Sequence, residues 1–228
     1  MVTQVESAAT DVVADAVQNG DEVDDINSGQ FFKIGGTDYT RDPVTIGLGR
    51  KKKNPDDADN IRLTGCTALI VMSEKAVWFG HLWETLSYDS TDEVFQQQVI
   101  DFINNGGTQN PNEQQSLKAH ADDFKGVNGA SAWILYPVAD DVYEEDGSTT
   151  PVYYKDKNNK LQQAVKDLTG ITATMTEYTP SDENNKALGR SLYQYDPQAR
   201  APDPNKPDQP VRGFRFIHEH TNEGTHFF

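Results

Sequence analysis

A cysteine and a histidine fifteen residues apart are the side chains of this sequence best suited to covalent chemistry. Cys66 stands just before an apolar, β-rich run at 67–72, and His81 lies within a second such run at 76–82. The polar residues Ser73-Glu74-Lys75 between the runs predict a hairpin, and a turn centred on the first two of them places Cys66 opposite His81. Directly opposed side chains share a face, with Cβ atoms about 4.5–5.5 Å apart, so the thiol and the imidazole are expected near hydrogen-bonding reach.

Such a pair would make a nucleophile. The imidazole takes the thiol proton, and the thiolate–imidazolium pair that results lowers the pKa of the cysteine by several units. Gly65 precedes Cys66, and its missing side chain lets backbone N–H groups approach a substrate carbonyl, which suits an oxyanion hole at the Cys66 N–H. The alternative is that Cys66 is a small buried hydrophobe and His81 a core histidine, and a register slip by one residue would separate their faces.

The composition narrows the classes of partner. The chain has 228 residues, with 20 Lys and Arg against 36 Asp and Glu, so its net charge is −16. A chain this acidic repels phosphate backbones and anionic lipids, so we expect neither a nucleic-acid nor a membrane partner. No run approaches the ~18 apolar residues of a membrane-spanning helix. The single cysteine excludes an intramolecular disulfide and a four-cysteine zinc site.

A second constellation lies near the C-terminus. In a strand His218 and His220 point the same way, and with Glu219, Glu223 or His226 they form a candidate zinc or iron site. The alternative is a polar strand end followed by a frayed tail. We favour that alternative, because no HExxH helix motif is present and the segment ends the chain, and we predict no metal site.

The elements that must position these residues follow from the periodicity of the apolar residues. Alternating or continuous apolar runs predict about eight strands, and helical spacing with capping residues predicts two or three helices. The expected strands lie at 31–34, 44–48, 67–72, 76–82, 132–138, 171–178, 192–195 and 211–218, and the expected helices at 91–104, 113–121 and 159–168.

This element order lacks a strict βαβ alternation and therefore predicts an α+β fold. The strands at 67–72 and 76–82 are apolar on both faces and are expected to be central. The strand at 211–218 is too short to fold alone and is expected to join the main sheet. Residues 1–30 are acidic and predict a tail or pro-segment, and residues 31–228 predict a single domain.

One motif resembles a known family. Leu63-Thr64-Gly65-Cys66, with His81 fifteen positions on, is similar to the signature of the cytotoxic necrotizing factor group of glutamine deamidases. The chemoreceptor deamidases and a lethal-factor type of bacterial deamidase share the scheme. The resemblance is close over residues 60–83. It implies a central, mostly antiparallel β-sandwich with flanking helices and an enzyme that converts a glutamine side chain of a partner protein to glutamate.

The resemblance also implies roles for individual residues. Cys66 would be the nucleophile and His81 the general base, with no metal or cofactor. Some members carry a threonine six positions before the cysteine, and here that position is Asn60, whose amide oxygen would orient His81. A backbone carbonyl from an earlier strand is the alternative third group. Three aromatic residues would wall the cleft or else be ordinary core residues: Trp78, Trp83 and Tyr88.

The sequence therefore predicts a cysteine-dependent protein-glutamine deamidase, acting as a secreted toxin or effector. Secretion is suggested by the acidic surface rich in Asn, Asp and Thr, although the N-terminal residues lack the basic and apolar regions of a signal peptide. Two alternatives stay open. One is a non-catalytic acidic binding protein on the same scaffold, and the other is a Cys-His hydrolase of another amide or ester.

Overall fold

The chain divides into two units, each with its own β-sheet. The structure is a computed structural model. It describes residues 28–35, 43–48, 63, 65–107, 114–138, 154–178, 180, 191–200, 211–219 and 221–228.

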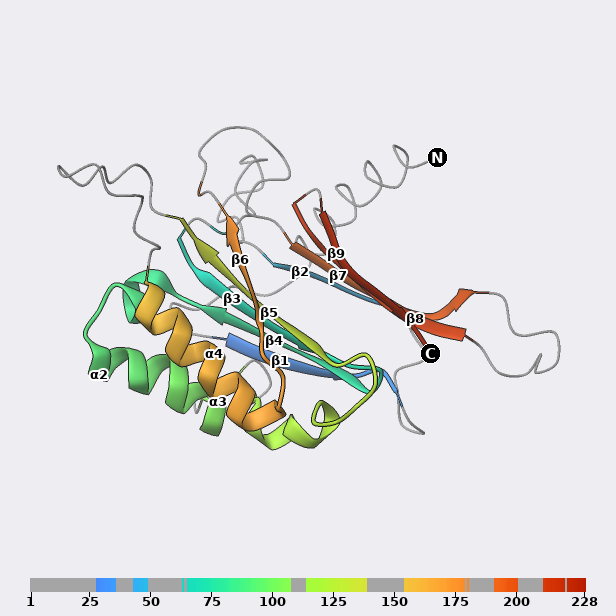
Figure 1. Cartoon of the computed structure of the whole chain (residues 1–228), viewed down its shortest axis with the longest axis horizontal. Coiled ribbons are helices and arrows are strands. Elements are labelled where there is room, and N and C mark those ends of the chain that lie inside the picture. Colours follow the sequence, from blue (N-terminus) through green and yellow to red (C-terminus); the bar gives the residue numbers. More distant parts are fainter. Residues whose placement is uncertain are drawn as a thin grey trace. The chain divides into compact units, whose positions relative to one another are not determined.

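One unit holds a five-stranded sheet in the order β1-β4-β3-β5-β6, together with the helices of the described residues (Figure 1). All neighbouring strands are antiparallel except β5 and β6, which run parallel. The helix α4 connects β5 to β6, as a crossover between parallel strands requires. The strand bounds are Ser28–Lys33 for β1, Thr67–Met72 for β3, Ala76–Leu82 for β4, Ser131–Pro137 for β5 and Thr174–Tyr178 for β6.

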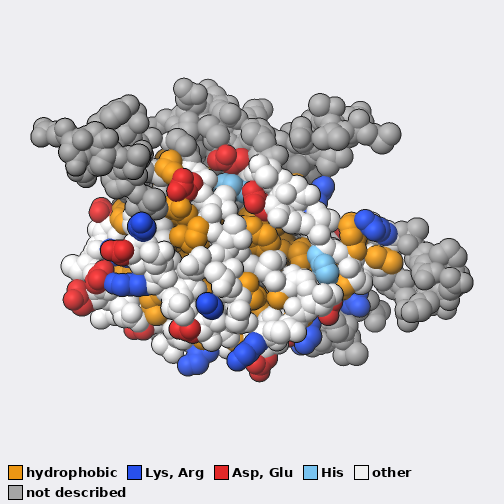
Figure 2. All heavy atoms as spheres, viewed as in Figure 1, with side chains coloured by type: hydrophobic (Ala, Val, Ile, Leu, Met, Phe, Trp, Pro, Cys, Tyr) orange, Lys and Arg blue, Asp and Glu red, His pale blue; other side chains and the backbone are white. Residues whose placement is uncertain are grey.

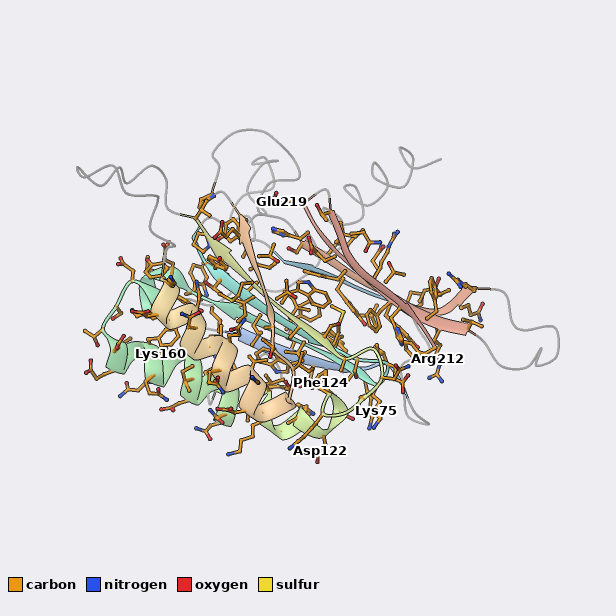
Figure 3. All side chains as sticks on the ribbon, viewed as in Figure 1. Lys75, Asp122, Phe124, Lys160, Arg212 and Glu219 are labelled. Carbon is orange, nitrogen blue, oxygen red and sulfur yellow. The ribbon has the colours of Figure 1, made fainter. Side chains whose placement is uncertain are left out.

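The β3–β4 turn sets the register around the candidate nucleophile. Met72 pairs with Val77, so the two turn residues are Glu74 and Lys75, one position later than predicted. Ser73 explains the shift: its backbone N–H donates to the Ala76 carbonyl at 2.9 Å, and its buried Oγ accepts the N–H groups of Lys75 and Ala76. The hydroxyl therefore stabilises a tight turn that begins one residue later than the polar pattern suggested. Lys75 marks this turn in Figure 3.

The helices cover one face of this sheet (Figure 1). A continuous helical stretch spans 92–105: Thr91 Oγ1 accepts the Val94 N–H at its start, and Gly106 ends it with a φ of +71°. This confirms the helix predicted at 91–104 with its cap and its stop. The helix bounds are Glu84–Tyr88 for η1, Asp92–Phe95 for α2, Gln96–Ile100 for η2, Asp101–Asn105 for α3, Lys118–Asp123 for η3 and Lys155–Thr169 for α4.

The hydrophobic core of this unit lies between the helices and the sheet. Alternate residues of the central strands, such as Val71 and its cross-strand partner Trp78, pack with the apolar stripe of α4, which includes Leu161 and Val165. An exposed ion pair at 2.7 Å joins Lys160 of α4, labelled in Figure 3, to Asp92 of α2. The other face of β3 and β4 is buried as well, which confirms that these two strands are central.

The other unit is a four-stranded antiparallel sheet in the order β2-β7-β8-β9. Its strands are Val44–Leu48, Ser191–Arg200, Val211–His218 and Thr221–Phe227. The expectation that 211–218 joins the main sheet is wrong, because β8 pairs with β7 and β9 instead. Strand β9 was expected to be a frayed tail, but its backbone pairs with β8 along most of its length.

The α+β class, the mostly antiparallel sheets and the flanking helices are confirmed. The packing of two sheets into a sandwich and the single domain over 31–228 stay predictions. Strand β1 begins at Ser28, so the last three residues of the segment 1–30 belong to a sheet and not to a tail. Residues 1–27 lie outside the described part of the chain.

The surface mixes charges of both signs. Figure 2 shows acidic and basic side chains interspersed over the face in view, so the net charge is not gathered there into one acidic patch. Among the described helices, none is long and apolar enough to cross a membrane.

Candidate functional site

Cys66 lies directly before β3, on a backbone that the hydroxyl of Tyr178 holds in place. Tyr178, the last residue of β6, accepts the Gly65 N–H at 3.0 Å and donates to the Cys66 carbonyl at 2.6 Å. Gly65 has a φ of +131°, a conformation that side-chain-bearing residues rarely adopt. Burial raises the pKa of Tyr178 well above its usual range, so its hydroxyl keeps its proton and remains a donor. Cys66 itself is half-buried.

His81 lies on β4 and is neutral at physiological pH. Part of its side chain is accessible, yet protein surrounds the ring, and burial lowers the pKa of His81 to about 4. The ring packs against the indole of Trp83 with a centroid separation of 5.0 Å. A neutral imidazole offers one nitrogen lone pair, as a general base requires.

His81 lies within β4, whereas Cys66 lies one residue before β3 and outside the paired residues. His81 pairs with Ala68, whereas the prediction paired it with Cys66. The difference follows from the position of the turn. When the centre of a hairpin turn moves by one residue, the partner of each residue on the other strand changes by two positions. A two-residue shift preserves the face, so the expectation that Cys66 shares a face with His81, as its diagonal neighbour, stays a prediction. In regular sheets such neighbours lie about 7–8 Å apart at Cα, with their Cβ atoms somewhat closer.

The carboxylate of Glu84, which was not predicted as a site residue, lies next to Gly65. Glu84 begins η1, and a Cβ built on Gly65 would meet Glu84 Oε2 at 1.9 Å, so the carboxylate occupies the space that the glycine leaves. Tyr154, directly before α4, donates its hydroxyl to Glu84 Oε1 at 3.1 Å. Burial raises the pKa of Glu84, and Asp89 adds to the rise while the Tyr154 hydrogen bond opposes it.

Lys157 of α4 fixes the element that carries Glu84. Its ammonium donates to the Tyr88 carbonyl at 2.6 Å and to the Ser90 carbonyl at 2.5 Å, where η1 ends. The ammonium also lies over the rings of Phe95 and Tyr154. Residues before α4, after β4 and at the end of β6 therefore meet around the Gly65–Cys66 backbone. The only sequence signal for Glu84 was its position immediately after the histidine-bearing strand.

The other residues expected at the site have different outcomes. Asn60 lies outside the described residues, so its proposed role stays a prediction. Trp78 and Tyr88 are fully buried members of the core, which agrees with the alternative that they are ordinary core aromatics. Trp83 is half-buried and contacts the His81 ring.

The C-terminal histidines of the second unit have local partners. His218 Nδ1 lies 2.8 Å from the Ser191 hydroxyl, and the His226 ring packs between Phe214 and Phe228. His220 lies outside the described residues. Among the residues that the structure describes, no group of three or more His, Cys, Asp or Glu side chains is arranged to hold a metal ion.

Comparison with known proteins gives little beyond this geometry. No family model matches the chain, and no curated protein matches it. Among solved structures, the crystal structure of the C-terminal domain of CNFy from Yersinia pseudotuberculosis matches with 13% identity and a TM-score of 0.29. The match covers 82% of this chain and 53% of that one, so the chain spans about half the length of its structural neighbour. At this TM-score the likeness carries no weight for function, which therefore has to be argued from the site.

Proposed function

We propose that the protein is a cysteine-dependent deamidase that converts a glutamine side chain of a partner protein to glutamate. The observation that supports this most is the placement of Cys66. Its backbone is held by Tyr178, and it stands one residue before β3, the strand that pairs with the strand of the neutral His81. That the thiol and the imidazole share a face is part of the proposal. A thiol, a nearby base and a fixed backbone turn are the parts that acyl transfer from an amide requires.

The proposed reaction proceeds through a thioester. His81 accepts the Cys66 proton as the sulfur attacks the carboxamide carbon, which forms a C–S bond and moves the carbonyl electron pair onto oxygen. The tetrahedral intermediate then collapses, the C–N bond breaks, and His81 returns the proton to the leaving ammonia. A water molecule, deprotonated by His81, attacks the thioester, and the proton passes back to the departing sulfur. The products are glutamate and ammonia, and no cofactor takes part.

The low pKa of His81 defines the timing of the first step. Because burial makes the imidazolium costly in the free protein, a neutral thiol and imidazole are the resting state, and the proton moves as the sulfur attacks. An oxyanion hole at the Cys66 N–H stays a prediction. The Gly65 N–H is excluded from that role because it already donates to Tyr178.

The substrate glutamine is proposed to lie on the surface of a basic protein. The chain carries a net charge of −16, which attracts a positively charged partner and speeds their encounter at low salt. A free amino acid would gain less from this long-range field, because its own charges largely cancel.

The direct test is to incubate the protein with whole-cell protein extracts and to identify converted glutamines by mass spectrometry while ammonia is measured. We expect conversion by the unaltered protein and a loss of at least about 100-fold in Cys66→Ala and His81→Ala. His120→Ala is the matched control, because His120 is another partly buried histidine whose pKa is lowered by burial. It is expected to retain full activity.

Two results would contradict the proposal. Conversion of glutamine that persists in Cys66→Ala would show that Cys66 is not the nucleophile. Hydrolysis of simple esters with no converted glutamine and no ammonia would instead favour a Cys-His hydrolase of another substrate class.

A further inference from the structure

Glu84 occupies an unusual position for a carboxylate in the proposed deamidase. Its Oε2 fills the volume where any residue other than glycine at position 65 would place its Cβ. It therefore lies against the backbone immediately before the nucleophile. Nothing in the thioester chemistry above uses this group.

One hydrogen bond holds the carboxylate, and two more hold the helical turn that carries Glu84. The Tyr154 hydroxyl donates to Oε1 at 3.1 Å, and Lys157 fastens the far end of η1 to α4 through two backbone carbonyls. The side chain is thus fixed by contacts with elements about 70 residues further along the chain.

A second observation links Glu84 to the nucleophile electrostatically. The Tyr178 hydroxyl, which bridges Gly65 and Cys66, is close enough to both the cysteine and Glu84 for each of their negative charges to oppose its ionisation. The groups that face this carboxylate are Tyr154, Tyr178, Asp89 and the Gly65–Cys66 backbone.

We propose that Glu84 is a positioning residue of the site: its carboxylate, held by Tyr154, braces the Gly65–Cys66 backbone and keeps the nucleophile in its thiol form until substrate is attacked. The expected effect of Glu84 on kcat rests on the proposed function. The expected effect of Glu84 on the reactivity of the Cys66 thiol can be measured without a substrate.

The bracing role follows from the geometry. Gly65 has a backbone conformation that only glycine adopts readily, and such a turn stays in place when its surroundings restrict it. Tyr178 restricts it through two hydrogen bonds, and Glu84 fills the space where a side chain at position 65 would begin. Removing the Glu84 side chain leaves a gap beside the turn, and a misplacement of about 1 Å in a reacting group costs up to about 100-fold in rate.

The effect on protonation follows from like charge. A carboxylate in the surroundings of a thiol raises the free energy of the thiolate, and Glu84 lies against the backbone of the residue before Cys66. Together with His81, whose surroundings disfavour the imidazolium, Glu84 is proposed to keep the resting pair uncharged.

Two variants separate these roles. Glu84→Gln keeps the shape and removes the charge, whereas Glu84→Ala removes both. We expect Glu84→Gln to retain kcat within about threefold and to react with iodoacetamide at pH 6 about threefold faster than the unaltered protein. We expect Glu84→Ala to lose about tenfold or more in kcat with little change in KM.

Glu177→Gln is the matched control. Glu177 also accepts a hydrogen bond from a tyrosine hydroxyl, that of Tyr136 at 2.8 Å, but it lies next to Tyr178 on β6 and so points to the opposite face of the sheet. It is expected to leave both the alkylation rate and kcat unchanged. Thermal melts of all three variants show whether the fold is retained.

The proposal is overturned if Glu84→Ala retains full kcat, if Glu84→Gln leaves the alkylation rate unchanged, or if Glu177→Gln reproduces either effect. Iodoacetamide is uncharged and needs no substrate, so the thiol readout tests Glu84 even when no glutamine is converted. A chain that shows the alkylation shift without deamidation would overturn the proposed function and leave the effect of Glu84 on the thiol in place.

Discussion

His81 shows how burial selects one version of thiol–imidazole chemistry. The sequence predicted a thiolate–imidazolium pair from the residue types alone. In the structure, burial lowers the pKa of His81 to about 4, so the free protein holds a neutral imidazole. The residue is therefore a general base whose proton transfer accompanies the attack and does not precede it. Residue type predicted the partners, but only the fold determines their resting charge.

The lowered pKa of His81 has a consequence for stability. Between pH 6.5 and about 4, the unfolded chain binds a proton at this position that the folded chain does not. The free energy of unfolding therefore falls as the pH falls through this window, by at most about 3 kcal/mol, and the loss is complete below pH 4.

Chemical denaturation at several pH values measures this effect. His81→Gln cannot titrate, so its free energy of unfolding is expected to change less across the window than that of the unaltered protein. His120→Gln is the control, because the charge of Asp123 opposes the lowering of the His120 pKa by burial. An unfolding free energy with the same pH dependence in the unaltered protein and in His81→Gln would contradict the buried, neutral histidine.

At the scale of elements, the β3–β4 hairpin shows what periodicity predicts and what it leaves open. The bounds of β3 and β4 agree with the apolar runs at 67–72 and 76–82. The register did not follow from the same runs, because a shift by two residues preserves every face. It depends on the hydrogen bonds of one buried hydroxyl, that of Ser73.

Ser73→Ala tests the role of this hydroxyl. The variant removes the hydroxyl partner of the Lys75 and Ala76 N–H groups and of the Asp123 carbonyl, and the bond to Ala76 is buried. We expect the free energy of unfolding to fall by about 1–3 kcal/mol in urea. Ser131→Ala is the control, since its hydroxyl makes only a 3.4 Å contact with the Gly129 carbonyl and is expected to matter less. Equal losses in the two variants would contradict this account of the turn.

Two elements had little sequence signal. Strand β9 is polar at most positions and was interpreted as a tail, yet its backbone groups pair with β8. The π-helical turn η1 is short and carries only one acidic residue in its first turn. Pairing to a neighbouring strand and packing against α4 stabilise these segments, and neither is encoded in their local pattern.

At the scale of the whole molecule, the order of the predicted elements was enough to predict the fold class, but the partner of each strand depends on contacts between distant segments. Strand β2 pairs with β7, about 150 residues further along the chain, and alternation of apolar residues specifies a face without specifying a neighbour. This is why β8 was assigned to the wrong sheet.

The residues of the candidate site also divide into those that the sequence could predict and those that it could not. Cys66 and His81 were predictable because both lie on one hairpin, and their residue types are reactive. Glu84, Tyr154 and Tyr178 were not, because the hydrogen bonds that gather them join residues about 70 and about 110 positions apart. A single sequence contains no periodicity that connects such positions.

The central claim is that His81 serves as the base for Cys66, and the rate of Cys66 alkylation by iodoacetamide tests it most directly. A thiol without assistance, with a pKa of about 8.5, reacts slowly at pH 6 because little thiolate is present. Because His81 accepts the proton while the sulfur attacks, without a resting thiolate, we predict that the unaltered protein reacts at pH 6 about tenfold faster than His81→Ala, while His120→Ala matches the unaltered protein. Equal rates in the unaltered protein and in His81→Ala, both at the level of an ordinary thiol, would contradict the claim.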